Sequence, residues 1–420
     1  MLGPAADPPV TQKREFWVLV GYATALGVSG AFVGLVYLGV IKFGGRWGAG
    51  FRPGWFGGHW WWVGGTTAAG VAVGLLRRLT RLPEEVPGLF DDLQAEHFDP
   101  RLVPGTMAVS AVSLIGGASV GPEKVLATMG AGAGSWVARR RGLSEEDSQV
   151  NTLAGIAGIF GGLFSSPVIA VMLILEVARP GGHRFSKTLV TNIVAGSVSF
   201  GIYFAIVGAV FLGAYQVPRY TFQDWQLLTG IPLGLFAALV AILAAGFMTL
   251  ASRLFGMLEV PAIVKSTLGG MMFGIVGVAL PLTMFSGGDQ LASVLKDART
   301  LGLALCLAIL IAKMLMYAVC QGSGFVGGPI FPLLFIGGTA GVVVHQAIPA
   351  VPLGLAFSCL LTAVLGSIAA APFAMVLMAA FLTRVGALQT APILIAVVTA
   401  FLSVEGGKYL LASRKQRRSR

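Results

Sequence analysis

Long apolar runs, separated by short polar stretches, recur along the chain from residue 16 to residue 412. Lipid offers no hydrogen-bond partners, so only helices and closed barrels can span a membrane. The runs lack the two-residue alternation of barrel strands, and they are long enough for helices. The pattern predicts an all-α polytopic membrane protein whose shorter runs, broken by glycine and proline, do not cross completely. The expected apolar segments are 16–43, 60–76, 103–118, 125–138, 150–177, 188–213, 227–250, 262–283, 300–318, 330–348, 352–368, 372–384 and 389–412.

An internal repeat relates the two halves of this pattern. The similar pairs are "GGASVGPEKVLATMGAGAG" (116–134) with "GSGFVGGPIFPLLFIGGTAG" (322–341), and "GIFGGLFSSPVIAVMLILE" (158–176) with "LGSIAAAPFAMVLMAAF" (365–381). The spacing agrees to one residue, because Pro167 follows Gly121 by 46 residues and Pro372 follows Gly327 by 45. Chance similarity between glycine- and alanine-rich helices is the alternative explanation.

The repeat predicts a division of the chain into two related halves. The first transmembrane half is expected at 16–213 and the second at 214–412, between an N-terminal segment (1–15) and a basic tail (413–420). In transporters such halves are often inverted, with tilted and broken helices and a substrate site where the halves meet.

The charge pattern is typical of a membrane protein. Hydrophobic residues make up 55% of the chain and charged residues 11%, against about 25% charged residues in soluble domains. The net charge is +11, and much of it lies in 77–81, 138–142 and 413–420. Basic clusters beside spans favour the cytoplasmic side. We therefore expect a multi-pass protein of the cell membrane with both termini cytoplasmic, rather than a nucleic-acid-binding protein.

The sequence gives no sign of an enzyme. Its four histidines do not cluster, and its three cysteines are scattered within apolar segments. Zinc sites and buried catalytic sites need such groups at defined spacings. We expect no catalytic residue, no metal and no cofactor.

One ionisable pair stands out inside the apolar pattern. Glu123 and Lys124 follow Gly121 and Pro122, a pair that favours the start of a helix. A helix N-terminus presents unpaired N–H groups and a positive dipole end, which together form an anion site. The Glu123 carboxylate can occupy that site and be displaced by a diffusing anion, and protonation would leave the site open. The alternatives are an acid that stabilises its own helix, or a surface Glu123–Lys124 pair.

The second copy of the repeat offers a matching helix start. The stretch "GGPIFP" (327–332) is again a glycine turn followed by a proline and an apolar helix. Two helix N-termini, one from each half, would then face one point near the middle of the membrane.

In these motifs the chain resembles the chloride channel and chloride–proton antiporter (CLC) family. Gly121–Val125 is similar to the family's signature around its gating glutamate, and Gly327–Pro332 is similar to its G-G-x-F-x-P signature. Phe164–Ile169 and Gly406–Lys408 match two further motifs in the same order. The resemblance implies a divergent prokaryotic-type member lacking CBS domains, an inverted-repeat helical fold, a homodimer with one pore per subunit, and anion transport.

The resemblance also implies a set of site residues. Glu123 is the expected gate, linked to protons. The expected anion-binding residues are Gly121, Glu123, Lys124, Val125, Gly328, Ile330 and Phe331. Pro329 takes a position whose amide binds the anion in the family, and proline has no N–H. The amides of Ile330 and Phe331 are expected to serve in a shifted register.

Other departures reshape the expected pocket. The family's anion-binding serine is missing from 80–90, and its late tyrosine falls at Leu411, with Tyr409 two places earlier. Lys313 matches a basic residue of the family and adds positive charge. Lys124 has two readings: it neutralises Glu123 or binds the anion, or it is a lysine that reaches the membrane surface.

The internal proton-transfer glutamate of the family's antiporters falls at Val177. An apolar residue there favours a channel over a proton-coupled antiporter. The predicted function is transport of chloride or a similar small anion, with protons as a second possible partner. The alternatives are an exporter of fluoride or another anion, and a non-transporting scaffold or anion sensor.

Overall fold

The computed structural model describes residues 14–83, 86–95 and 98–418. Helices make up nearly all of these residues, as the apolar pattern predicted, and the pairing of Gly121 with Gly328 is an isolated antiparallel bridge. The predicted N-terminal segment (1–15) lies almost wholly outside the described residues, and part of the basic tail (413–420) does so as well.

The chain divides into two compact units, of which the first comprises the described residues of 1–37, 90–103 and 126–210. Its helices pack closely where glycines face each other. An ideal Cβ on Gly161 would lie 2.6 Å from the Cα of Gly196, so α6 and α8 approach backbone to backbone. The helices that lie wholly or partly in this unit are α1 (Arg14–Gly44), α3 (Leu89–Ala95), η3 (Pro100–Leu102), α5 (Glu123–Arg141), α6 (Glu145–Leu163), α7 (Pro167–Ala178) and α8 (Gly182–Val207).

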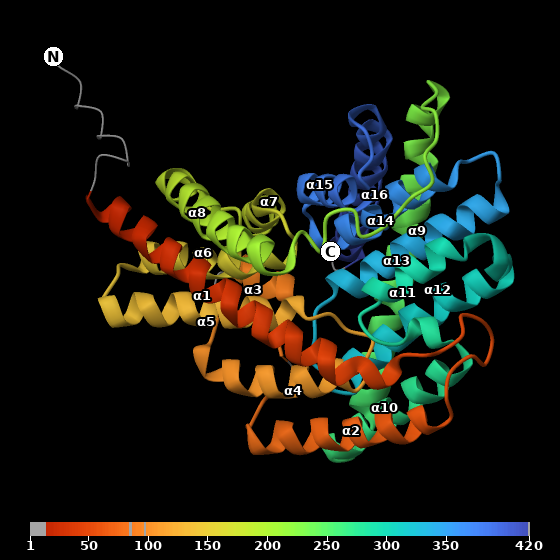
Figure 1. The fold of residues 1–420 in the computed structure, drawn as a ribbon, viewed down its shortest axis with the longest axis horizontal. Helices are drawn as coiled ribbons and strands as arrows, with labels where there is room; N and C mark the ends of the chain where they lie inside the picture. Colours follow the sequence, from red (N-terminus) through yellow and green to blue (C-terminus); the bar gives the residue numbers. More distant parts are fainter. Residues whose placement is uncertain (1–13, 84–85, 96–97, 419–420) are drawn as a thin grey trace. The chain divides into compact units, whose positions relative to one another are not determined.

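The second unit comprises the described residues of 38–89, 104–125 and 211–420. Its helices α2 and α10 lie side by side (Figure 1), and the Ser266 hydroxyl donates to the Gly70 carbonyl at 2.7 Å between them. The further elements that lie wholly or mostly in this unit, together with α2 and α10, are η2 (Gly45–Gly48), α2 (Trp61–Leu79), α4 (Val103–Ile115), α9 (Trp225–Met257), α10 (Ala262–Ala279), η4 (Pro281–Thr283), α11 (Gly288–Lys296), α12 (Ala298–Gly322), α13 (Ile330–Ala347), α14 (Leu353–Ala369), α15 (Pro372–Thr383), η5 (Ala387–Gln389) and α16 (Thr390–Arg418).

Seven helices among the described residues are long and apolar enough to cross a bilayer. Four more apolar helices have 10 to 17 residues, which agrees with the expectation of incomplete crossings. The chain is an integral membrane protein. The seven candidate spans are Arg14–Gly48, Arg184–Val207, Trp225–Met257, Ala262–Ala279, Ala298–Gly322, Ile330–Ala347 and Ala387–Ser413.

One predicted span is wrong. The run 150–177 is not a single helix, because α6 ends at Leu163 and α7 begins at Pro167. The break contains Ser165 in the left-handed region at φ 48°. The Ser166 hydroxyl then caps α7 by accepting the Ile169 amide at 3.3 Å. An apolar run hides such a break because both helices on either side of it are apolar.

The two copies of the repeated motifs are followed by the same succession of elements. A helix begins at Glu123 in the first copy and at Ile330 in the second. A further helix then leads to a short one that begins at a proline, Pro167 or Pro372. This succession supports the internal repeat, while the division at residue 213 stays a prediction.

Candidate functional site

Two helix N-termini meet in the second unit. The N–H of Gly121 donates to the carbonyl of Gly328 at 2.9 Å, and the N–H of Gly328 donates back to Gly121 at 2.7 Å. Each glycine stands two residues before the first residue of a helix, Glu123 of α5 or Ile330 of α13. This pair of backbone hydrogen bonds therefore fixes the two helix starts side by side.

The carboxylate of Glu123 lies on the amide end of α13. Its Oε1 accepts a hydrogen bond from the N–H of Ile330 and a longer one, at 3.4 Å, from the N–H of Phe331. Pro329 is the N-cap of α13, so the first amide that this helix can offer is that of Ile330. Glu123 is fully buried, so these amides replace water around Oε1. The structure brings together three residues that the sequence predicted: Glu123, Ile330 and Phe331. We call these three residues, together with Gly121 and Gly328, the Glu123 site.

The two glycines make room for the carboxylate. An ideal Cβ on Gly121 would lie 2.6 Å from Cδ of Glu123, and one on Gly328 would lie 2.6 Å from its Cγ. Real Cβ atoms do not come this close to carbon. A side chain at either position would therefore compete with Glu123 for the same space.

The second carboxylate oxygen of Glu123 has a different hydrogen-bonding environment from the first. Glu123 Oε2 is buried, and among the described residues it accepts no hydrogen bond. Tyr317 of α12 is also buried, and Gln321 links its hydroxyl to the carbonyl of Gly327, next to Gly328. The sequence analysis missed Tyr317, because a single tyrosine in an apolar helix gives no distinguishing signal.

Lys124 is buried beside Glu123, and its Nζ donates to the carbonyl of Pro87. Pro87 belongs to the stretch where the family's serine was expected. The same stretch is held by Arg77, whose guanidinium donates to the carbonyls of Pro83 and, at 2.8 Å, Gly324. Lys124 thus brings a positive charge into the segment that lacks the serine hydroxyl.

Lys313 holds a loop instead of contacting Glu123. Its Nζ donates to the carbonyls of Thr283 at 3.0 Å and Phe285 at 2.7 Å, and it lies 4.9 Å from the ring centroid of Phe335 on α13. This buried charge is satisfied by carbonyls, so its direct contribution is to the packing of α12 against the 283–285 loop. Its field at the anion site stays a prediction.

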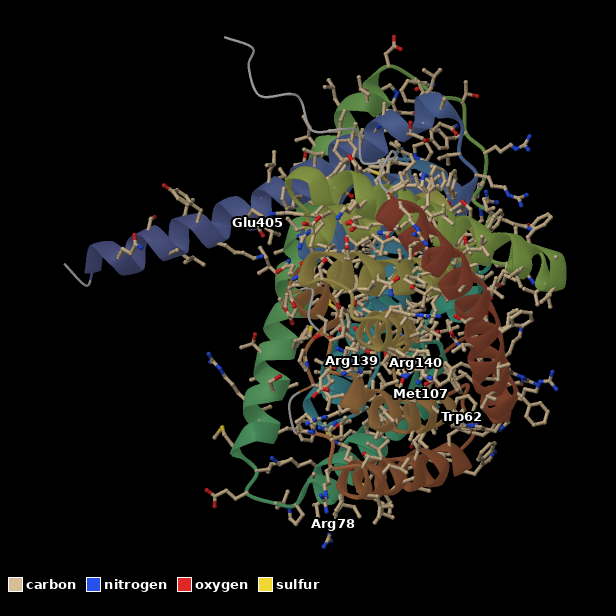
Figure 2. All side chains as sticks on the ribbon, turned by 90° about the vertical axis from the view of Figure 1, so that its left-hand side faces the viewer. Trp62, Arg78, Met107, Arg139, Arg140 and Glu405 are labelled. Carbon is tan, nitrogen blue, oxygen red and sulfur yellow. The ribbon has the colours of Figure 1, made fainter. Side chains whose placement is uncertain are left out.

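Four other predicted positions lie at different places. Val125 is buried in the first turn of α5, and Val177 is buried near the end of α7. Tyr409 and Leu411 are 73% and 65% exposed on α16. Figure 2 shows the part of α16 after Glu405 extending away from the other helices of the second unit. The structure therefore does not place Tyr409 or Leu411 in the predicted pocket, because α16 continues as one helix to Arg418 and leaves both side chains exposed.

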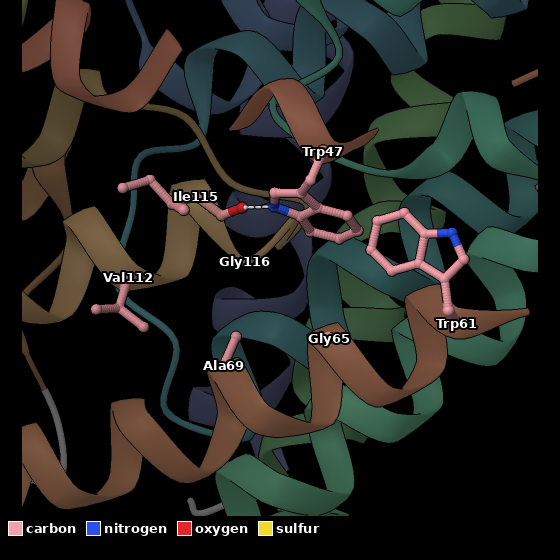
Figure 3. A pocket seen from close by; sticks show the side chains of 7 residues that line it. All are labelled: Trp47, Trp61, Gly65, Ala69, Val112, Ile115 and Gly116. Carbon is pink, nitrogen blue, oxygen red and sulfur yellow. Dashed lines mark hydrogen bonds between the residues drawn. The ribbon is translucent and has the colours of Figure 1, made fainter. Parts of the chain in front are cut away.

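A separate pocket lies at the end of α4, beside Ile115 and Gly116 (Figure 3). It has about 270 Å³, and its lining is apolar: Trp47, Trp61, Gly65, Ala69, Val112, Ile115 and Gly116. The indole N–H of Trp47 donates to the Ile115 carbonyl at 2.7 Å and so offers nothing to a ligand. An anion needs donors that this lining lacks, so the pocket is not the anion site.

The fold and this site define the class: a polytopic α-helical membrane protein with a buried carboxylate seated on a helix N-terminus. Within the described residues, no group of three or more histidine, cysteine, aspartate or glutamate residues could hold a metal ion. The sequence profile of the family described as "Voltage gated chloride channel" matches residues 67–405. The chain belongs to this family.

Known relatives agree with the family. "Putative ion-transport protein YfeO" of Salmonella choleraesuis is 28% identical over 320 residues, covering 73% of this chain and 74% of that protein. Two solved structures share the fold. A slow cyanobacterial Cl⁻/H⁺ antiporter has a TM-score of 0.80 at 16% identity, over 96% of this chain and 99% of that one. A CLC-type fluoride/proton antiporter has a TM-score of 0.76 at 20% identity, over 94% and 96%.

Proposed function

We propose that this protein transports small inorganic anions across the cell membrane, with Glu123 as the gate. The observation that carries the proposal is the hydrogen bond from the Ile330 amide to Glu123 Oε1. A helix N-terminus that accommodates one carboxylate oxygen offers the same donors to a free anion. The family membership supports transport over an enzymatic role.

The gate works by exclusion. The Glu123 carboxylate and a diffusing anion compete for the amides of Ile330 and Phe331, because two negative charges repel strongly in such a buried place. When the side chain leaves, the anion takes its place, and when the anion moves on, the side chain returns. Lys124 stabilises an anion near the Pro87 segment by its charge.

Transport takes one of two modes. Passive flow is the first candidate, because Val177 and not a carboxylic acid occupies the internal proton position. Proton-coupled exchange is the second candidate, and a specific observation favours it: Glu123 Oε2 is buried, and no group in the described ranges donates to it. A proton on this oxygen would neutralise the side chain and free it from the amides. Two relatives of the same fold are described as a chloride/proton and a fluoride/proton antiporter, which makes fluoride a substrate to test beside chloride.

The assembly follows the family as a further part of the proposal. We propose a homodimer with one pore in each subunit, with both termini on the cytoplasmic side. The predicted halves 16–213 and 214–412 would each supply one of the helix starts at the Glu123 site.

Anion flux from liposomes that hold the purified protein tests the proposal. Chloride, fluoride, bromide and nitrate are each measured with and without a proton gradient, for the wild type, Glu123→Gln and the control Glu405→Gln. Glu405 is a surface glutamate of the same unit that pairs with Lys408. We expect flux above that of empty vesicles, a changed rate in Glu123→Gln, and no change in the control.

The outcomes separate the candidates. Uphill anion movement driven by protons supports exchange, whereas flux that ignores the proton gradient supports passive flow. If the wild type binds anions but moves none, the chain is a scaffold or sensor and the transport proposal fails. Transport that is identical in Glu123→Gln and the wild type would remove Glu123 from the gate alone.

A further inference from the structure

A tyrosine of α12 is linked through Gln321 to the backbone next to the Glu123 site. Tyr317 is 2% exposed, and its hydroxyl oxygen lies 3.5 Å from the amide nitrogen of Gln321, one turn later on the same helix. The same Gln321 nitrogen donates to the carbonyl of Gly327 at 3.2 Å. Gly327 directly precedes Gly328, which pairs with Gly121. Gln321 therefore ties the Tyr317 hydroxyl to the backbone segment that forms one wall of the site.

The proton of this hydroxyl has no acceptor among the described residues. Among the residues that the structure describes, the Tyr317 oxygen accepts from Gln321 and donates to no group. A buried hydroxyl normally uses its proton in a hydrogen bond. In the part of the chain that the structure describes, Glu123 Oε2 is also buried and accepts no hydrogen bond, and Gly328, next to Gly327, borders this side chain, because an ideal Cβ there would lie 2.6 Å from Cγ of Glu123. The hydroxyl proton of Tyr317 is thus available close to the Gly327–Gly328 segment, which leads directly into the first amides of α13.

We propose that the Tyr317 hydroxyl is a ligand of the transported anion. The inference rests on the proposed function and adds a specificity-determining residue to the same site. An anion bound by the Ile330 amide would accept a second hydrogen bond from Tyr317. This donor supplies the hydroxyl that the 80–90 segment lacks and that Tyr409 does not bring to the site.

The proposal has a chemical consequence for selectivity. Hydrogen bonds to charged acceptors are the strong ones, and they strengthen as the charge of the acceptor is concentrated in a smaller ion. The Tyr317 hydroxyl therefore favours fluoride and chloride over bromide. A purely structural tyrosine, which only orders the Gly327 loop through Gln321, would affect all anions equally.

The test compares Tyr317→Phe with Tyr215→Phe. Tyr215 is a matched control, because it is a buried tyrosine of the same unit whose hydroxyl donates to the carbonyl of Gly288 at 3.4 Å. Equilibrium binding of fluoride, chloride and bromide is measured on the full chain in detergent, beside liposome flux. We expect Tyr317→Phe to weaken chloride binding by about tenfold or more and to lower the preference for fluoride over bromide. Tyr215→Phe should keep the wild-type values.

The failures of the two proposals differ. If the wild type moves no anion, the proposed function fails and the ligand role falls with it. If the wild type transports and Glu123→Gln alters transport, but Tyr317→Phe keeps the affinities and the anion preference, only the ligand role is wrong.

A second measurement decides the matter if Tyr317→Phe does not fold. 3-Fluorotyrosine is placed at position 317 or at position 215, and its fluorine NMR shift is followed during titration with chloride. A chloride-dependent shift at position 317 and none at position 215 is expected. No shift at position 317 at saturating chloride would overturn the inference.

Discussion

Replacing Glu123 by alanine removes the group that occupies the amide end of α13. The wild-type Oε1 accepts the Ile330 and Phe331 amides, and a free anion must displace it to bind. In the variant the two amides keep their positions, because the Gly121–Gly328 backbone pair and the helix itself hold them. The anion then binds without competition and without the repulsion of a second negative charge.

The size of the effect follows from the hydrogen bonds. A hydrogen bond to a charged group contributes about 1.5–3 kcal/mol net, and the Phe331 bond at 3.4 Å adds little because of its length. The carboxylate is therefore favoured in the site by a factor of about 10 to 150. The apparent dissociation constant of the anion rises as the Glu123 carboxylate fills more of the sites. Removing this carboxylate in Glu123→Ala should therefore tighten anion binding by about tenfold or more.

Isothermal titration of the detergent-solubilised protein with chloride and bromide measures this change. Glu405→Ala is the control, because it removes a surface carboxylate without touching the site. Unchanged or weaker anion binding in Glu123→Ala would show that the carboxylate and the anion do not compete, and the exclusion gate would have to be abandoned.

Three further changes test the surroundings of the site. Gly328→Ala places a methyl group where the carboxylate of Glu123 lies, so chloride flux should fall by about tenfold or more. The control Gly246→Ala, where an added Cβ would meet no atom within 4 Å, should keep the wild-type rate. Equal rates in the two variants would contradict the close fit at Gly328. Lys124→Met removes a buried positive charge and should raise the chloride concentration for half-maximal flux by about tenfold, and Lys124→Arg should restore most of the loss; a loss as large in the arginine variant would assign Lys124 a shape-dependent role. Lys313→Met leaves loop carbonyls without a donor and should lower the free energy of unfolding by about 2 kcal/mol, seen as a lower melting temperature in detergent, and an unchanged melting temperature would count against its structural role.

Local signals in the sequence predicted the centre of the site. A Gly-Pro pair before an acid indicates a helix start with a carboxylate in its first turn, and Glu123 begins α5. The second glycine turn indicated another helix start, and α13 begins at Ile330. The missing N–H of Pro329 led to the prediction that the amides of Ile330 and Phe331 bind the anion. In the structure both amides donate to Glu123, and their binding of an anion stays a prediction. These features depend on neighbouring residues, which a sequence displays directly.

Long-range contacts were beyond the sequence. Nothing in the pattern indicated that Lys124 would donate to Pro87, 37 residues earlier, or that Gln321 would link Tyr317 to the carbonyl of Gly327. The exposed position of Tyr409 depends on whether the last apolar run is straight or bent. The pattern of apolar residues is the same in both cases, so the sequence does not show which one occurs. The apolar pattern missed the break between α6 and α7 for the same reason, although the family motif matched at Phe164–Ile169 is a helix start and contains a Ser-Pro pair.

The central claim is that the Ile330 amide holds either the Glu123 carboxylate or an anion. Anomalous diffraction from crystals of Glu123→Ala and of the wild type grown in bromide would test it most directly. We predict a bromide peak within hydrogen-bonding distance of the Ile330 nitrogen in the variant, and in the wild type the carboxylate at that place with a weaker peak or none. Bromide that avoids this nitrogen in Glu123→Ala, or that binds there equally in both proteins, would contradict the account.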